Sequence, residues 1–179
     1  MLSLLAGCDT LEHGTVLDDE DIEMMLKNHV FLVPTLSYGK QVELLGEKCD
    51  LPAYAVKKAL DSRKIRMSSF AKALQSGVKI AMGSDAGMPF CDHGQNAFEL
   101  IAMVEAGMTV MQSIQSMTCW AAELLDMSDQ IGSIESGKCA DIVIVGQDPL
   151  QDISGLGRKE NIKAVLKEGE IVVDRGLNG

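Results

Sequence analysis

Apolar residues in the first part of the chain alternate between short continuous runs and helical spacing. The short runs end at His13, at Leu36 and just before Gly83, and each has the length of a strand. After each run, apolar residues recur every three or four positions, as they do on one face of a helix. Repeated units of strand and helix form a parallel sheet with helices outside it. The pattern therefore predicts an α/β fold for this part.

The predicted helices have recognisable ends. Asp18 is placed to cap the first long helix, and Pro52 opens the second, which ends at Gly77. Thr109 and Gln112 match a capping box, and helices are predicted from there to about residue 126. Residues 37–51 have little pattern. The predicted apolar faces are Ile22, Met25 and Leu26; Met67, Phe70, Ala71 and Leu74; and Ala97, Leu100, Ile101 and Val104.

The pattern changes after Met127, where short alternating runs are separated by glycine and aspartate. These runs predict strands, with hairpin turns at residues 135–138 and 168–169. We therefore divide the chain into residues 1–127 and residues 128–179. A closed (β/α)₈ barrel needs eight strands and about 250 residues. The three strand and helix units before residue 127 thus form either a small open sheet or part of a larger barrel.

The composition excludes several classes of partner. The 179 residues are 46% hydrophobic, which is enough to bury a core. The formal charge of −10 disfavours the phosphate contacts on which nucleic-acid binding depends. No segment approaches the roughly 20 apolar residues of a membrane span. The five cysteines are scattered, odd in number and without a CxxC pair, which favours a reducing cytoplasm.

Two candidate functional residues follow predicted strands. Reactive side chains of parallel α/β proteins lie just beyond the carboxyl ends of the strands, where His13 and Asp85 are placed. Their neighbours Gly14, Gly83 and Gly87 are expected to leave room for an ion or a substrate. An imidazole and a carboxylate suit a hydrolytic zinc. The alternative is that both residues only cap helices or bond to the backbone.

An ordered set of motifs resembles a known family. The motifs are "EHG" at 12–14, "VPTL" at 33–36, "GSDAG" at 83–87, "HGQNAFEL" at 93–100 and "GSIESGKCADIVIV" at 132–145. Together they resemble the carboxyl-terminal part of the metal-dependent amidohydrolase superfamily, specifically its imidazolonepropionase-like and Xaa-Pro dipeptidase-like group. The resemblance covers essentially the whole chain. It implies the last three βα units of a (β/α)₈ TIM-type barrel, followed by a small β-sandwich segment.

The resemblance also implies roles for particular residues. His13 would be a ligand of one metal of a binuclear site, or would polarise the substrate where only one metal binds. Asp85 would be a ligand of the other metal and the general base. His93 would help to hold the substrate, or would brace the helix that follows it. The implied cofactor is zinc, as one or two divalent ions. The implied reaction is hydrolysis of a C–N bond, in a dipeptide or a cyclic amide, by metal-activated water.

A second hypothesis remains beside this one. The family's paired histidines on the first strand, its bridging ligand on the fourth and its histidine on the fifth have no counterpart in these residues. A catalytic zinc usually takes three protein ligands. The chain could therefore be a truncated, inactive fragment or an interaction module that binds no catalytic metal. Strands taken from a closed barrel expose edges and apolar helix faces, so we expect self-association or pairing with the rest of the barrel.

Overall fold

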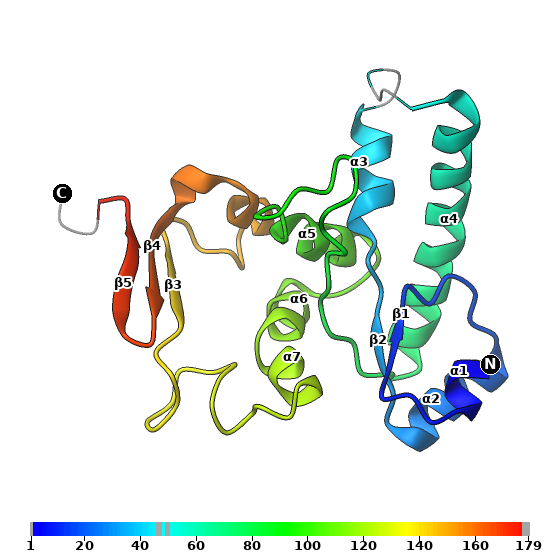
Figure 1. The fold of residues 1–179 in the computed structure, drawn as a ribbon, viewed down its shortest axis with the longest axis horizontal. Coiled ribbons are helices and arrows are strands. Elements are labelled where there is room, and N and C mark those ends of the chain that lie inside the picture. Colours follow the sequence, from blue (N-terminus) through cyan, green and yellow to red (C-terminus); the bar gives the residue numbers. More distant parts are fainter. Residues whose placement is uncertain (1, 46–47, 49–50, 177–179) are drawn as a thin grey trace.

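The computed structural model describes residues 2–45, 48 and 51–176 (Figure 1). The first part holds α1 (Leu2–Leu5), β1 (Thr10–Glu12), α2 (Asp19–Asn28), β2 (Phe31–Val33), α3 (Ser37–Leu45), α4 (Ala53–Gln75), α5 (Ala97–Glu105), α6 (Val110–Met117) and α7 (Cys119–Leu124). The second part holds β3 (Ile142–Val145), β4 (Ile162–Lys167), β5 (Glu170–Asp174) and the short 3₁₀ helices η2 (Ile153–Gly157) and η3 (Lys159–Asn161). Helix α3 forms in a stretch whose pattern predicted nothing.

The parallel arrangement of the first three predicted strands is confirmed. β1 and β2 pair in parallel, and Leu32 of β2 forms a parallel bridge with Ile80 on its other side. The third predicted strand, at residues 78–82, forms fewer strand hydrogen bonds than expected and is reduced to a single bridge. It makes only the bonds around that bridge, and the next N–H, of Met82, donates to the carbonyl of Ser116 instead. The order across the sheet is therefore β1, β2 and the segment 78–82.

The predicted helix ends are confirmed where they depend on local bonds. The Asp18 carboxylate accepts the N–H of Asp21, and the Asp21 carboxylate accepts the N–H of Asp18, so α2 starts with a capping box. Thr109 and Gln112 make the same reciprocal pair at the start of α6. α4 begins directly after Pro52. These ends form because both partners lie within one turn of each other.

The core lies between the sheet and helices α2, α4 and α5. On α2 and α5 the side chains that are buried differ from the apolar faces that the sequence predicted. Leu26 is 40% exposed because the buried residues of α2 are Asp21, Ile22 and Met25, and Leu26 lies outside this face. On α5 the side chains Glu99, Ala102 and Met103 are buried together with Leu100, and the rest of the predicted face is only half-buried. The reason is that α5 is covered on two sides, by the core and by η2.

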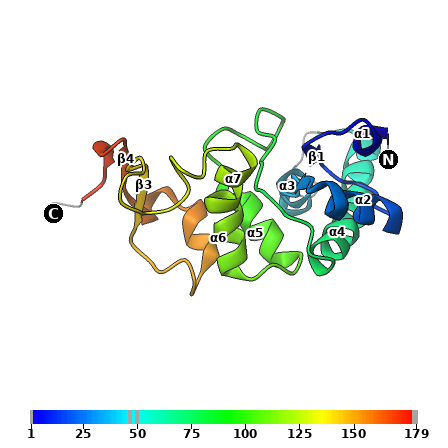
Figure 2. The same ribbon diagram turned by 90° about the horizontal axis from the view of Figure 1, so that it is seen from below.

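The second part contains a three-stranded antiparallel sheet in the order β3, β4, β5, at the opposite end of the molecule from α1 (Figure 2). Glu168 and Gly169 have φ of 52° and 86°, as a two-residue hairpin turn requires, so that predicted hairpin is confirmed. The hairpin at 135–138 is wrong. A turn forms there, but among the described residues between α7 and this turn there is no strand that could pair with β3. The division at residue 127 stays a prediction.

Two further expectations concern the environment of the chain. Among the helices that the structure describes, none has the length and apolar character needed to cross a membrane. Cys8, Cys91, Cys119 and Cys139 are free thiols, and Cys49 lies outside the described residues.

Candidate functional site

His13 and Asp85 lie just beyond the carboxyl ends of parallel strands. We call this end of the sheet its carboxyl edge. His13 follows β1 directly, and its N–H donates to the carbonyl of Val33 at 2.8 Å. Asp85 follows the segment 78–82 on the other side of β2. Because neighbouring strands lie about 4.8 Å apart, these two strand ends are about 10 Å apart. Both residues are exposed. The shared edge is observed, and a metal centre to which both residues contribute stays a prediction.

Each of the three strand ends carries a residue in the left-handed region. The φ angles are 69° at His13, 49° at Thr35 and 53° at Asp85. Residues other than glycine adopt such angles only at a cost of about 1–3 kcal/mol, and they concentrate at active sites and ligand clamps. Three of them on successive strands mark this edge as the candidate functional site.

Thr35 fixes one nitrogen of the His13 ring, a contact that the sequence did not reveal. The Thr35 Oγ1 atom lies 2.7 Å from His13 Nδ1. Arg66 holds the same threonine from α4, since its Nη1 donates to the Thr35 carbonyl at 2.9 Å. Within the described residues, His13 Nε2 forms no hydrogen bond. The ring is therefore oriented through Nδ1, with Nε2 left for a ligand.

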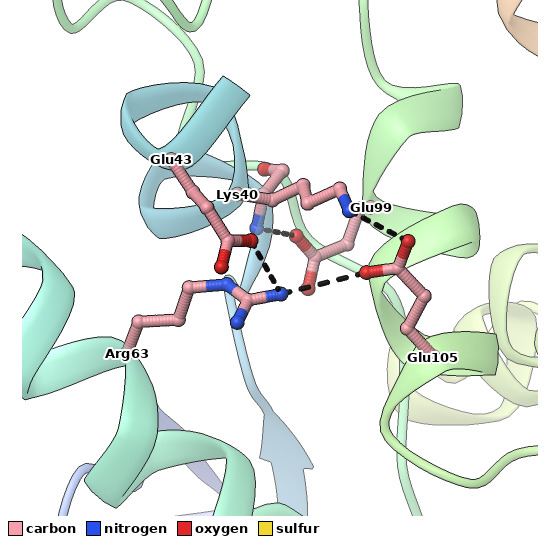
Figure 3. Close-up of polar contacts among 6 residues, drawn as sticks. Lys40, Glu43, Arg63, Glu99 and Glu105 are labelled. Carbon is pink, nitrogen blue, oxygen red and sulfur yellow. Dashed lines mark hydrogen bonds and ion pairs between the residues drawn. The ribbon is translucent and has the colours of Figure 1, made fainter. Parts of the chain in front are cut away.

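Glu99 holds the turn that carries Thr35. Its carboxylate is fully buried and accepts the N–H groups of Leu36 at 2.7 Å and Ser37 at 2.6 Å. Burial raises the pKa of Glu99 to about 7, although the two backbone donors and the guanidinium of Arg66 act in the opposite direction. Figure 3 shows Glu99 reaching from α5 toward the start of α3. This carboxylate thus caps α3 from a distant part of the chain.

Ion pairs join the three helices around Glu99 (Figure 3). Lys40 of α3 pairs with Glu105 of α5 at 2.7 Å, and Arg63 of α4 lies 3.4 Å from both Glu43 and Glu105. Glu43 and Glu105 are more than a third exposed, and pairs of this kind contribute little stability. We therefore assign the position of the turn to Glu99, with the ion pairs as support.

The loop that carries Asp85 is held by a buried cysteine. Cys91 Sγ lies 3.3 Å from the carbonyl of Ser84 and 3.9 Å from the hydroxyl of Ser37, and the Cys91 carbonyl accepts the N–H of Gly87. His93 is exposed, with its Nε2 atom 3.6 Å from where a β-carbon on Gly87 would lie. His93 therefore lies over the Asp85 loop, and both roles that the sequence left open stay predictions.

The glycines beside the site do not leave the room that the sequence indicated. A β-carbon at Gly14 would lie 2.5 Å from Leu32 Cδ1, and one at Gly83 would lie 2.5 Å from Val33 Cγ1. The space beside these two glycines is filled by side chains of β2. Gly14 and Gly83 are therefore needed for close packing against β2, and that expectation is corrected.

The described residues do not make up a complete zinc site. Among them, no three or more His, Cys, Asp or Glu side chains form a group that could hold a metal ion. A catalytic zinc takes three protein ligands and a water. The imidazole of His13 and the carboxylate of Asp85 are of the right chemical type for two ligands. The fit is therefore partial.

Comparisons with known proteins agree with the sequence motifs. A family model described as the amidohydrolase family matches residues 3–172. The ochratoxinase of Aspergillus niger is 29% identical over 99% of this chain and 36% of its own length. The imidazolonepropionase of Alkaliphilus oremlandii is 28% identical over 92% of this chain and 35% of its own length.

Solved structures share the fold. A Xaa-Pro dipeptidase with bound methionine in the active site has 42% identity and a TM-score of 0.83, over 94% of this chain and 41% of its own. A putative prolidase from Bifidobacterium longum has 32% identity and a TM-score of 0.85, over 95% of this chain and 43% of its own. The chain thus spans roughly two fifths of these two structures.

Proposed function

The chain belongs to the amidohydrolase family, and we propose that it supplies part of the active site of a metal-dependent hydrolase that cleaves C–N bonds. The observation that carries the proposal is the placement of His13 and Asp85 beyond the carboxyl ends of parallel strands, with a left-handed backbone at both. A dipeptide is the proposed substrate class, since the similar structures include a Xaa-Pro dipeptidase and a putative prolidase.

The proposed architecture follows the same family. β1, β2 and the segment 78–82, with their helices, would be the last three βα units of a (β/α)₈ barrel. The sheet β3–β5 would belong to a small β-sandwich. β1 has its outer edge unpaired within the described residues, and Leu5 and Val16, which come before and after β1 in the sequence, are 64% and 70% exposed. This edge supports pairing with further strands, from another part of a longer protein or from a second copy.

We assign each side chain a role from its surroundings. His13 would bind a divalent ion through Nε2, because Thr35 engages Nδ1. The exposed carboxylate of Asp85 would be a ligand of the other divalent ion and would accept a proton from the attacking water, and His93 would contact the substrate. A bound zinc would supply a water with a pKa near 7. The remaining ligands would come from outside these 179 residues.

A second candidate is an inactive fragment or interaction module that binds no catalytic metal. It is favoured by one observation, the lack of a metal-holding group of three or more ligands in the described residues. Under this hypothesis the unpaired edge of β1 and the exposed side chains of Leu5 and Val16 would serve association only.

Metal analysis separates the two candidates. The 179-residue chain and a form extended upstream would be dialysed with zinc, analysed for bound metal and assayed for hydrolysis of Ala-Pro. We expect the extended form to retain about one ion or more per chain and to hydrolyse the dipeptide. His13→Ala and Asp85→Ala should lose metal and activity. His29→Ala is the matched control, because His29 is exposed and precedes β2 at the opposite edge of the sheet.

Two outcomes would favour the inactive fragment. One is a failure of both parent forms to retain zinc. The other is equal retention by all three histidine and aspartate variants, which would mean that the ion binds elsewhere.

A further inference from the structure

The peptide between Thr35 and Leu36, in the turn after β2, is held at both ends by opposite charges. Its carbonyl accepts a hydrogen bond from Arg66 Nη1 at 2.9 Å, and its N–H donates to the Glu99 carboxylate at 2.7 Å. A peptide is a dipole with a negative oxygen and a positive hydrogen. The cation thus lies at the negative end and the anion at the positive end, and a flip of this peptide would reverse both contacts. We call Arg66 and Glu99 the peptide clamp.

The peptide clamp is more than the start of a helix requires. A helix is usually capped by a nearby serine, threonine, aspartate or asparagine. Here the carboxylate comes from α5, 63 positions after Leu36, and the guanidinium comes from α4, 31 positions after Thr35. Glu99 is fully buried and Arg66 is half-buried, and burying charged groups is costly. This cost indicates a role beyond starting α3.

The backbone that the peptide clamp holds is strained. Thr35 has a φ of 49°, and a β-branched residue is an outlier in the left-handed region. Such a residue keeps this conformation only where the surrounding structure imposes it. Because rotation about the Cα–C bond of Thr35 turns the carbonyl that Arg66 holds, the peptide clamp fixes the backbone of Thr35.

The side chain of Thr35 connects this geometry with the candidate site. Its Oγ1 atom lies 2.7 Å from His13 Nδ1, and it accepts from Arg66 Nη1 at 3.4 Å. Within the described residues, the His13 ring forms no other hydrogen bond. A β-branched side chain has few rotamers, so the position of this hydroxyl follows the backbone. Relaxation of Thr35 would therefore take the hydroxyl away from the imidazole.

We propose that Arg66 and Glu99 are positioning residues of the hydrolytic site, which orient the His13 imidazole by holding the peptide after Thr35. This assignment rests on the proposed function and deepens it, because it names what directs His13 Nε2 toward a divalent ion. Neither residue needs to touch the ion or the substrate. Groups that hold a metal ligand in place typically account for about 10- to 100-fold in metal affinity. The loss of either member of the peptide clamp should therefore weaken metal binding without removing a ligand.

Nitrogen-15 NMR of the histidine rings tests the orientation in the 179-residue chain. Spectra at pH 8, above the pKa of about 7 of Glu99, would compare the wild type with Glu99→Gln and Arg66→Gln. Each variant should shift the His13 Nδ1 resonance in the direction in which Thr35→Val shifts it. In a Thr35→Val background neither should shift it further, because the hydroxyl is already absent. A role in stability alone would not move this resonance in the folded protein.

Glu105→Gln is the matched control, because it removes an exposed carboxylate from the same helix, α5. It should leave the His13 resonance unchanged. The resonances of His29, which is exposed and precedes β2, should be unchanged in every variant. In the form extended upstream, zinc titrations should show at least about tenfold weaker binding for Glu99→Gln and Arg66→Gln, and wild-type affinity for Glu105→Gln.

Three results would overturn the proposal. They are an unshifted His13 resonance in the folded variants, an equal shift in the Thr35→Val background, and unchanged zinc affinity of the extended variants. If the extended parent binds no zinc, the proposed hydrolase function fails, and the His13 spectra alone decide on the peptide clamp. Circular dichroism would show whether each variant folds. Glu99→Gln and Arg66→Gln act at opposite ends of one peptide, so either variant is sufficient if the other does not fold.

Discussion

Raising the pH from about 4 to 8 should destabilise the fold through the buried carboxylate of Glu99. Burial raises the pKa of Glu99 from 4.5 to about 7 in the folded chain. Between these two values the folded state binds a proton that the unfolded state has released. The free energy of unfolding therefore falls as the pH rises through this window.

The size of the effect follows from the shift in pKa. A shift from 4.5 to about 7 corresponds to about 3 kcal/mol, since each pKa unit is worth about 1.4 kcal/mol. The free energy of unfolding of a domain is typically about 5–15 kcal/mol, so this loss is measurable. Glu99→Gln removes the titration and keeps the size of the side chain. Its single oxygen leaves one of the two N–H groups of Leu36 and Ser37 without an acceptor, at a cost of about 1–3 kcal/mol.

The assay is urea unfolding followed by circular dichroism at several pH values for the wild type and Glu99→Gln. Other carboxyl groups titrate equally in both proteins, so the difference between the two free energies of unfolding isolates Glu99. The wild type should be the more stable protein near pH 5. This advantage should shrink by up to about 3 kcal/mol as the pH approaches 8. Glu23→Gln, at an exposed position of α2, is the matched control and should follow the wild type throughout.

A constant difference between wild type and Glu99→Gln, within about 0.5 kcal/mol from pH 5 to pH 8, would contradict the reasoning. It would mean that the folded protein does not alter the pKa of this carboxylate.

Two further predictions concern the carboxyl edge of the sheet, where His13 lies. Gly14→Ala should lower the free energy of unfolding by about 2–3 kcal/mol in urea, because its β-carbon would overlap Leu32 and φ is +48°. Gly94→Ala has a positive φ but open space around it, so it should cost about 1 kcal/mol, and equal costs would show that the overlap is relieved. Thr35→Val should change the ¹⁵N resonance of His13 Nδ1, because it removes the hydroxyl that Nδ1 contacts, while Thr35→Ser should preserve it. Identical His13 spectra in all three proteins would rule out the orienting contact.

The sequence by itself determined the features whose partners are close along the chain. The N-cap at Asp18, the capping box at Thr109 and the hairpin turn at Glu168–Gly169 form from residues within one turn of each other. His13 and Asp85 could be selected in the same way, since each follows a strand pattern directly. Their common edge then follows from parallel pairing.

Tertiary structure decided everything that depends on a distant partner. Helix α3 has no predictive pattern, and the carboxylate that caps it, Glu99, lies 62 and 63 positions away from the two N–H groups it accepts. The contact of Thr35 with His13 spans 22 positions. The role of Gly14 depends on Leu32, which enters from the neighbouring strand. Local patterns report local bonds, whereas burial and side-chain contacts between strands are set only when the chain folds.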